Sequence, residues 1–210
     1  MKFFSLENPI WKFIGNLADF FLLSCLWYLC CLPVVTAGGG GKGLRVAATT
    51  ALYYVTLKMA RGQEGQLIPA FFHSFKQNLK QATALWVGYL AVGILLVLDL
   101  VICLQTSSVF AGAMFFTSVV LLACWALFIT MLFPLVARCD NTIGALFKMG
   151  IAMALRNVMP VLAALMVTVA FFAVGVFVFW PVLLVAPGLA SYCNAFLFNR
   201  IFDKYGMTLE

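Results

Sequence analysis

The chain has 210 residues, of which 65% are hydrophobic and only 10% are charged, and its formal net charge is +6. Soluble domains are typically about 45–50% apolar and about 25% charged, so this composition excludes an ordinary soluble protein and indicates a membrane protein. The basic residues lie between apolar stretches and form no single cluster, which argues against nucleic-acid binding. We expect one multi-pass membrane domain over residues 1–210.

The apolar stretches are long and do not alternate with polar residues. Only helices and closed barrels satisfy the backbone inside a bilayer, and barrel strands alternate apolar and polar residues. The sequence therefore predicts an all-α fold, a polytopic integral membrane helix bundle with five to six transmembrane helices plus cytoplasmic amphipathic helices. Its expected surroundings are the lipid bilayer of the cell (cytoplasmic) membrane.

The first apolar stretch, Phe13–Leu32, predicts the first span, and Pro33 closes it. The stretch is longer than the roughly 7–15 apolar residues of a signal peptide, and it contains Asp19. We therefore expect an uncleaved span.

A glycine-rich segment, residues 36–45, follows and is predicted to be a loop because it holds five glycines and two cations. It departs from the nucleotide-binding pattern of a glycine, four residues and Gly-Lys-Ser/Thr, because Thr36 stands at the first position and Gly43 follows Lys42. Val46–Met59 comes next and is rich in small residues, which allow close helix packing in membranes. By itself it is short for a span.

Gly65–Gln81 predicts an amphipathic surface helix that continues into a span over Ala82–Leu104. Phenylalanines give this helix an apolar face, and each lysine near an anionic leaflet contributes about 1 kcal/mol of attraction. We expect this helix to anchor the span, and the alternative is a cytoplasmic contact with a partner or lipid. The candidate contact residues are Phe71, Phe72, Phe75, Lys76 and Lys80.

The second half of the chain predicts a span over Val109–Ala137 and an amphipathic helix over Ile143–Leu155. No Asp, Glu, Lys, Arg or His occurs in residues 157–199. At about 1.5 Å per residue this stretch would form a helix of roughly 65 Å, about twice the roughly 30 Å hydrocarbon core of a bilayer. We predict two helices, divided near Pro181 and Pro187.

The distribution of cations leaves the number of spans open. If Val34–Met59 does not cross, five spans put the N-terminus outside together with Lys2 and Lys12. If it crosses, six spans put both ends inside and leave only Lys42 and Arg45 outside. Six spans are favoured. In both arrangements the C-terminus is cytoplasmic, with the basic segments 58–80, 138–156 and 200–204.

Asp19 and Asp99 are the only charged residues inside the predicted spans. Burying an ionised carboxylate in a membrane is expensive, so both are candidates for a proton or ligand pathway, and the alternative is a structural hydrogen bond to a neighbouring helix. Their expected depths differ, which argues against a paired carboxylate site. We expect no catalytic residue, no cofactor and no metal, because the chain has one histidine, no Cys-x-x-Cys and no intramembrane protease motif.

Short motifs are spread over nearly the whole chain: Leu17–Asp19, Leu32–Thr36, Ala48–Lys58, Arg61-Gly62, Glu64-Gly65, Phe71–Asn78, Leu98–Leu100 and Phe198–Tyr205. Together they resemble the YesL-like family of bacterial membrane proteins, whose function is unknown. The resemblance implies a frequent genomic setting beside genes for carbohydrate uptake and degradation, and it implies no activity and no catalytic residue. The chain departs from the family pattern by an extra glycine-rich piece over Gly39–Val46.

We expect a non-enzymatic membrane protein that is an accessory or regulatory component linked to carbohydrate uptake, with a carbohydrate transporter permease as its partner. The alternative is a small-molecule transporter in its own right. Transporters often contain internal repeats and broken helices, and here no convincing repeat accompanies the prolines of residues 157–199.

The favoured six-span arrangement predicts that both ends of the chain lie in the cytoplasm. Reporter fusions or cysteine-accessibility labels at residues 2 and 210 should therefore report the same side of the membrane. Labels on opposite sides would contradict six spans.

Overall fold

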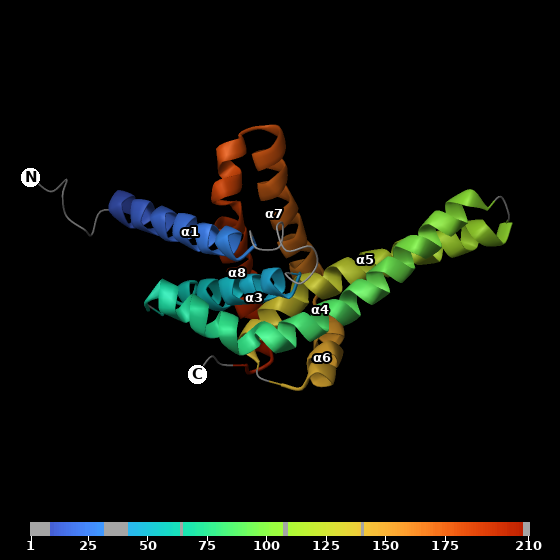
Figure 1. Cartoon of the computed structure of the whole chain (residues 1–210), viewed down its shortest axis with the longest axis horizontal. Coiled ribbons are helices and arrows are strands. Elements are labelled where there is room, and N and C mark those ends of the chain that lie inside the picture. Colours follow the sequence, from blue (N-terminus) through green and yellow to red (C-terminus); the bar gives the residue numbers. More distant parts are fainter. Residues whose placement is uncertain (1–8, 32–41, 64, 107–108, 140, 208–210) are drawn as a thin grey trace, which may run out of the picture.

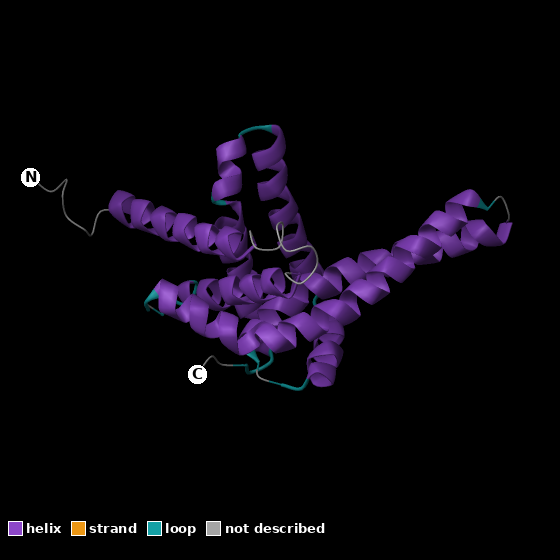
Figure 2. Cartoon of the chain, in the orientation of Figure 1, coloured by secondary structure: helices purple, strands orange, loops and turns teal. Residues whose placement is uncertain are grey.

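The computed structural model describes residues 9–31, 42–63, 65–106, 109–139 and 141–207. Within these residues it contains seven α-helices and one short 3-10 helix (Figure 1, Figure 2). The elements are α1 (Pro9–Cys31), α3 (Lys42–Met59), α4 (Leu67–Gln105), α5 (Val109–Arg138), α6 (Ile143–Arg156), α7 (Val158–Phe177), η1 (Trp180–Leu184) and α8 (Ala186–Lys204). The predicted all-α fold is confirmed.

α4 and α5 form a long hairpin whose far part projects away from the other helices (Figure 1). α4 is unbroken from Leu67 to Gln105, as expected for an amphipathic helix that continues into a span. Tyr89 and Trp125 join the two helices through stacked rings, with centroids 4.0 Å apart. Beyond this contact the hairpin exposes large apolar side chains, as a helix pair facing lipid does.

The uncharged stretch is divided into α7 and α8, as predicted. Residues 178–179 lie between α7 and η1, and η1 contains Pro181. Pro187 lies in the first turn of α8, where its missing N–H costs no helical hydrogen bond.

The start of α3 corrects one prediction. The segment 36–45 was expected to be a loop throughout, but α3 already begins at Lys42. After Gly41 only one glycine remains in the segment, among good helix formers such as lysine, leucine and arginine. An isolated glycine costs a helix about 1 kcal/mol. The packing contacts of the helix offset this cost. Residues 32–41, with Pro33 and the first part of the Gly39–Val46 piece, lie outside the described residues.

Three helices of the described chain are long and apolar enough to cross a membrane, namely Leu67–Gln105, Gly112–Arg138 and Val158–Phe177, and Leu17–Cys31 is a shorter apolar helix. α3 and α8 are less apolar, yet they lie at the centre of the bundle. Their buried residues include Thr50 and Thr56 of α3 and Ser191 and Asn194 of α8. Because these two helices contact protein more than lipid, their composition need not match that of hydrocarbon.

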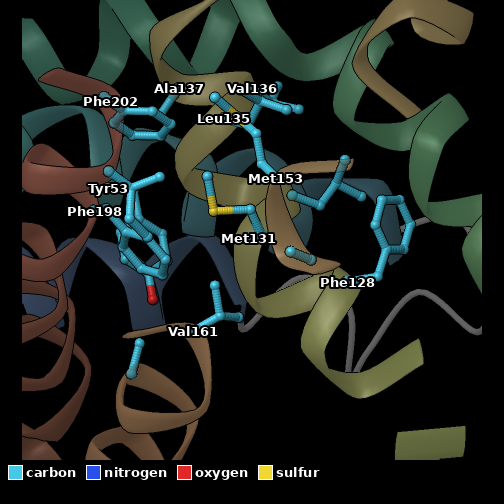
Figure 3. Packing of buried hydrophobic residues seen from close by; sticks show 14 of the residues in the cluster. Tyr53, Phe128, Met131, Leu135, Val136, Ala137, Met153, Val161, Phe198 and Phe202 are labelled. Carbon is cyan, nitrogen blue, oxygen red and sulfur yellow. The ribbon is translucent and has the colours of Figure 1, made fainter. Parts of the chain in front are cut away.

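The main apolar core joins α3 and α8 to α4, α5, α6 and α7. Figure 3 shows its side chains, with Tyr53 and Phe198 next to each other. Their rings meet edge to face, with centroids 5.8 Å apart and an interplanar angle of 80°. A second cluster, which includes Leu23 and Phe71, joins α1 to α3 and α4.

The long helices alternate in direction along the chain. α1 and α3 are antiparallel, because Trp27 donates a hydrogen bond to Thr49 (3.0 Å) while Asp19 lies beside Met59 at the other end of the pair. A short turn joins α3 to α4, and the α4–α5 and α7–α8 hairpins continue the alternation. The end of the bundle that holds residues 58–67, 138–157 and 199–207 is called the base below.

α1 crosses α8 at very short range. The backbone N–H of Gly188 donates a hydrogen bond to Ser24 Oγ (2.9 Å), and a Cβ at position 188 would lie 2.5 Å from the Phe20 carbonyl oxygen. The Tyr28 hydroxyl donates to the Leu183 carbonyl (2.7 Å) further along the same contact. Only glycine allows this approach, so Gly188 fixes the position of the first helix.

We predict that Gly188→Ala destabilises the protein by about 1–3 kcal/mol, because the added methyl group would overlap the α1 backbone. The matched control is Gly144→Ala in α6, where the added Cβ would meet nothing within 4 Å. Thermal unfolding in detergent should show a lower Tm for Gly188→Ala alone. An unchanged Tm for Gly188→Ala would contradict the α1–α8 crossing.

Candidate functional site

The base brings together the three basic segments that the sequence predicts on one side of the membrane. Asn199 of α8 is their common partner. Its Nδ2 donates to the Leu57 carbonyl (3.1 Å), and its Oδ1 accepts from Arg61 Nε (3.1 Å) and from Arg138 Nη1 (2.9 Å). One amide thus joins the end of α3, the turn after it and the end of α5. This group, with Asp203, is called the arginine clasp.

Arg138 is the most enclosed member of the arginine clasp, with a fully buried side chain. Its Nη2 donates to the Met207 carbonyl, and its guanidinium lies 4.8 Å from the centre of the Phe202 ring. Asp203 pairs with Arg61 and lies 3.7 Å from Arg138 Nη2. Two arginines therefore share one carboxylate, so the arginine clasp retains a net positive charge.

A second polar contact crosses the middle of the bundle. Asn194 of α8 is fully buried, and its Nδ2 donates to Thr168 Oγ1 (2.8 Å) of α7 and to the Tyr53 hydroxyl (3.4 Å) of α3. Such interhelical hydrogen bonds in membranes are worth roughly 0.6–2 kcal/mol. The Asn194 Oδ1 has no hydrogen-bond partner among the described residues.

Asp19 lies at a polar cavity of about 440 Å³ near the base. The cavity is lined by α1, by the turn between α3 and α4, and by α8, through residues that include Met59, Gln63 and Tyr192. The turn between α3 and α4 therefore contributes to two features. Arg61 belongs to the arginine clasp, and the residues that follow it line this cavity. A half-buried carboxylate in such a cavity can attract a cation or exchange a proton.

Asp99 lies elsewhere, on the projecting α4–α5 hairpin. Its carboxylate accepts a hydrogen bond from Ser118 Oγ, which lies 2.9 Å from the Met114 carbonyl oxygen. Asp99 thus makes a hydrogen bond to a neighbouring helix, which is the structural alternative to a proton or ligand pathway. The structure does not bring Asp19 and Asp99 together.

The proposed cytoplasmic contact residues divide into buried and exposed ones. Phe71 is fully buried and stacks on Phe75, with ring centroids 6.4 Å apart. Phe71 must therefore be removed from the candidate contact residues, because its apolar face packs against α3 and leaves no area for a partner. Phe72 is 37% exposed, Phe75 is half-buried, and Lys76 and Lys80 are exposed.

The sequence reasoning missed the members of the arginine clasp and Asn194. One signal was present, because the uncharged residues 157–199 contain three asparagines. All three are buried, and Asn157 also makes a tertiary bond, from its Nδ2 to the Tyr205 hydroxyl (3.1 Å). Amide side chains in an otherwise apolar membrane segment thus indicate helix–helix hydrogen bonds.

The fold is that of a membrane protein with several candidate spans, joined by buried polar contacts. Residues 20–100 match the family model described as "Protein of unknown function, DUF624". The match runs from α1 to the far part of α4, and it includes Arg61 and the turn at the cavity. No curated protein and no solved structure matches the chain.

We predict that Asn199→Ala destabilises the protein by at least about 2 kcal/mol, because it leaves one carbonyl and two arginines without their shared partner. Asp203→Asn should cost less than about 1 kcal/mol, because the Asp203 side chain is 59% exposed and its ion pairs are screened by water. Thermal unfolding of the two variants in detergent makes the comparison. Equal losses would contradict this ranking and mean that the ion pair holds the base as strongly as the amide does.

Proposed function

We propose that this chain is a non-enzymatic, multi-pass component of the cell membrane that acts as an accessory or regulatory partner of a carbohydrate uptake system. The observation that carries the proposal is the construction of the base, in which the arginine clasp ties separate segments into one unit. The first part of α4, which follows the turn with Arg61, carries the exposed side chains Phe72, Lys76 and Lys80. A firmly held surface with apolar and basic side chains is suited to a partner protein at the membrane face.

The link to carbohydrate uptake rests on the resemblance to the YesL-like family. The DUF624 match over residues 20–100 contains several of the motifs on which that resemblance depends, among them Ala48–Lys58 and Phe71–Asn78. The resemblance implies a setting beside carbohydrate genes, and a permease is the membrane component of such a system that this chain could contact within the bilayer.

We also propose six spans, with both ends of the chain in the cytoplasm. The alternation of α1, α3, α4, α5, α7 and α8 supports this arrangement, because six helices of alternating direction return the chain to the side on which the first one begins. The base also gathers most of the cations, whereas Arg45 lies near the opposite end of α3. Positive residues concentrate on the cytoplasmic side of membrane proteins.

The second candidate function is transport of a small molecule. The cavity beside Asp19 favours it, because a carboxylate in a polar cavity within a membrane bundle is a common element of a substrate or ion pathway. Asn194, whose buried Oδ1 has no partner among the described residues, offers a further acceptor on the same helix as Tyr192 of the cavity.

We predict that the chain, purified in mild detergent, retains a carbohydrate transporter permease that mass spectrometry identifies. The triple variant Phe72→Ala, Lys76→Gln, Lys80→Gln should lose most of that permease, because it removes the exposed apolar and basic contacts of α4. The matched control, Arg200→Gln with Lys204→Gln, removes two exposed cations from α8 and should retain it.

Two results would contradict the accessory function. One is equal recovery of the permease with the triple variant and with the control, which would reduce this part of α4 to an anchor. The other is substrate-dependent flux in liposomes that contain only this chain, which would establish the transporter. An Asp19→Asn variant that abolishes such flux would assign the cavity to it.

A further inference from the structure

A large apolar groove lies where α6 packs against the α4–α5 hairpin. It encloses about 530 Å³ and is lined by residues that include Val92, Cys124, Trp125, Phe128, Ile151 and Leu155. An apolar cavity of roughly 150 Å³ holds a benzene molecule, so this groove has room for a chain several times larger. Two of its three helices are candidate membrane spans, so its open side faces the hydrocarbon that surrounds such spans.

The floor of the groove consists of aromatic rings held in fixed positions. Trp125 stacks on Tyr89 at an interplanar angle of 11° and donates its Nε1–H to the Tyr89 carbonyl (3.3 Å). Phe128 packs against Gly150 of α6, where a Cβ would lie 2.7 Å from Phe128 Cε2. Because Gly150 lets α6 approach this closely, the groove is a formed feature of the fold.

One edge of the groove carries uncompensated positive charge. Lys148 of α6 is exposed and lies on the same helical stripe as Ile151 and Leu155, three and seven residues further on. Arg156 is exposed next to Leu155. Neither cation forms an ion pair among the described residues, and α6 contains no acidic side chain.

We propose that this groove is a binding site for one anionic phospholipid, with an acyl chain against Trp125 and Phe128 and the phosphate at Lys148. A phospholipid is the one abundant membrane molecule that combines a long apolar chain with a negative group at the interface. The site would hold α6 against the hairpin through a ligand supplied by the membrane. This inference does not depend on the accessory function.

The test measures lipid retention by native mass spectrometry. The full chain in detergent is mixed with equal amounts of phosphatidylglycerol and phosphatidylcholine that carry identical acyl chains. We expect one retained phospholipid, with phosphatidylglycerol favoured about fivefold, the ratio that one cation near an anionic lipid provides. Lys148→Gln should bring this ratio close to one, and Arg200→Gln, an exposed cation on α8, should leave it unchanged.

A second pair of variants tests the acyl-chain part of the site. Cys124→Trp fills the groove from its exposed edge and should remove both lipid adducts, whereas Val119→Trp adds the same ring to an exposed position of α5 outside the groove lining and should keep them. If Cys124→Trp does not fold, the comparison of Lys148→Gln with Arg200→Gln decides alone.

The proposal is overturned if the unsubstituted chain retains no phospholipid or retains both lipids equally. It is also overturned if Lys148→Gln keeps the full preference, or if Val119→Trp loses the lipid as completely as Cys124→Trp. A dimer that Cys124→Trp dissociates would show instead that a second copy of the chain occupies the groove.

Discussion

The arrangement of the base depends on one side-chain amide. Asn199 uses both ends of its amide group, so that a carbonyl of α3, the turn after α3 and the end of α5 are all fixed to α8. Polar groups inside a membrane protein must find their partners within the protein, because lipid offers none. Arg138 is an example, since its buried side chain is held by Asn199, a backbone carbonyl and the face of Phe202, while its Nε has no hydrogen-bond partner among the described residues. The position of Arg61, and with it the turn beside the Asp19 cavity, follows from these bonds.

Much of the fold could be predicted from the sequence, because bilayer thickness and helix rise limit what a long apolar stretch can form. The unbroken α4 and the division of residues 157–199 near Pro181 are confirmed on these grounds. The start of α3 at Lys42 differs from the predicted loop, because glycine content does not show where, within a glycine-rich segment, a helix begins. The burial of Phe71 could not be predicted, since an amphipathic pattern does not say whether its apolar face meets lipid or another helix. The arginine clasp was missed because its partners are far apart in sequence, as Arg61 and Asn199 are.

The hydropathy of each helix depends on whether the helix faces lipid or protein. α4, α5 and α7 have exposed apolar surfaces and meet the criteria for spans, whereas α3 and α8 are less apolar and carry the buried polar residues that bind the bundle together. This division explains why counting apolar stretches left five and six spans unresolved. The same division gives the outer helices and the base different roles. The outer helices offer apolar area to lipid, and the base offers a charged face, so a partner protein and a phospholipid would meet different parts of the molecule.

The coupling between Arg138 and Asn199 measures whether this amide holds the base. A double-mutant cycle would compare Arg138→Met, Asn199→Leu and the double variant by their free energies of unfolding in detergent. We predict a coupling energy of about 1–3 kcal/mol, because each single variant leaves the other member of the Arg138–Asn199 bond without its partner, a loss that the double variant does not add. Additive losses, with a coupling energy near zero, would show that the Arg138–Asn199 bond does not hold the base.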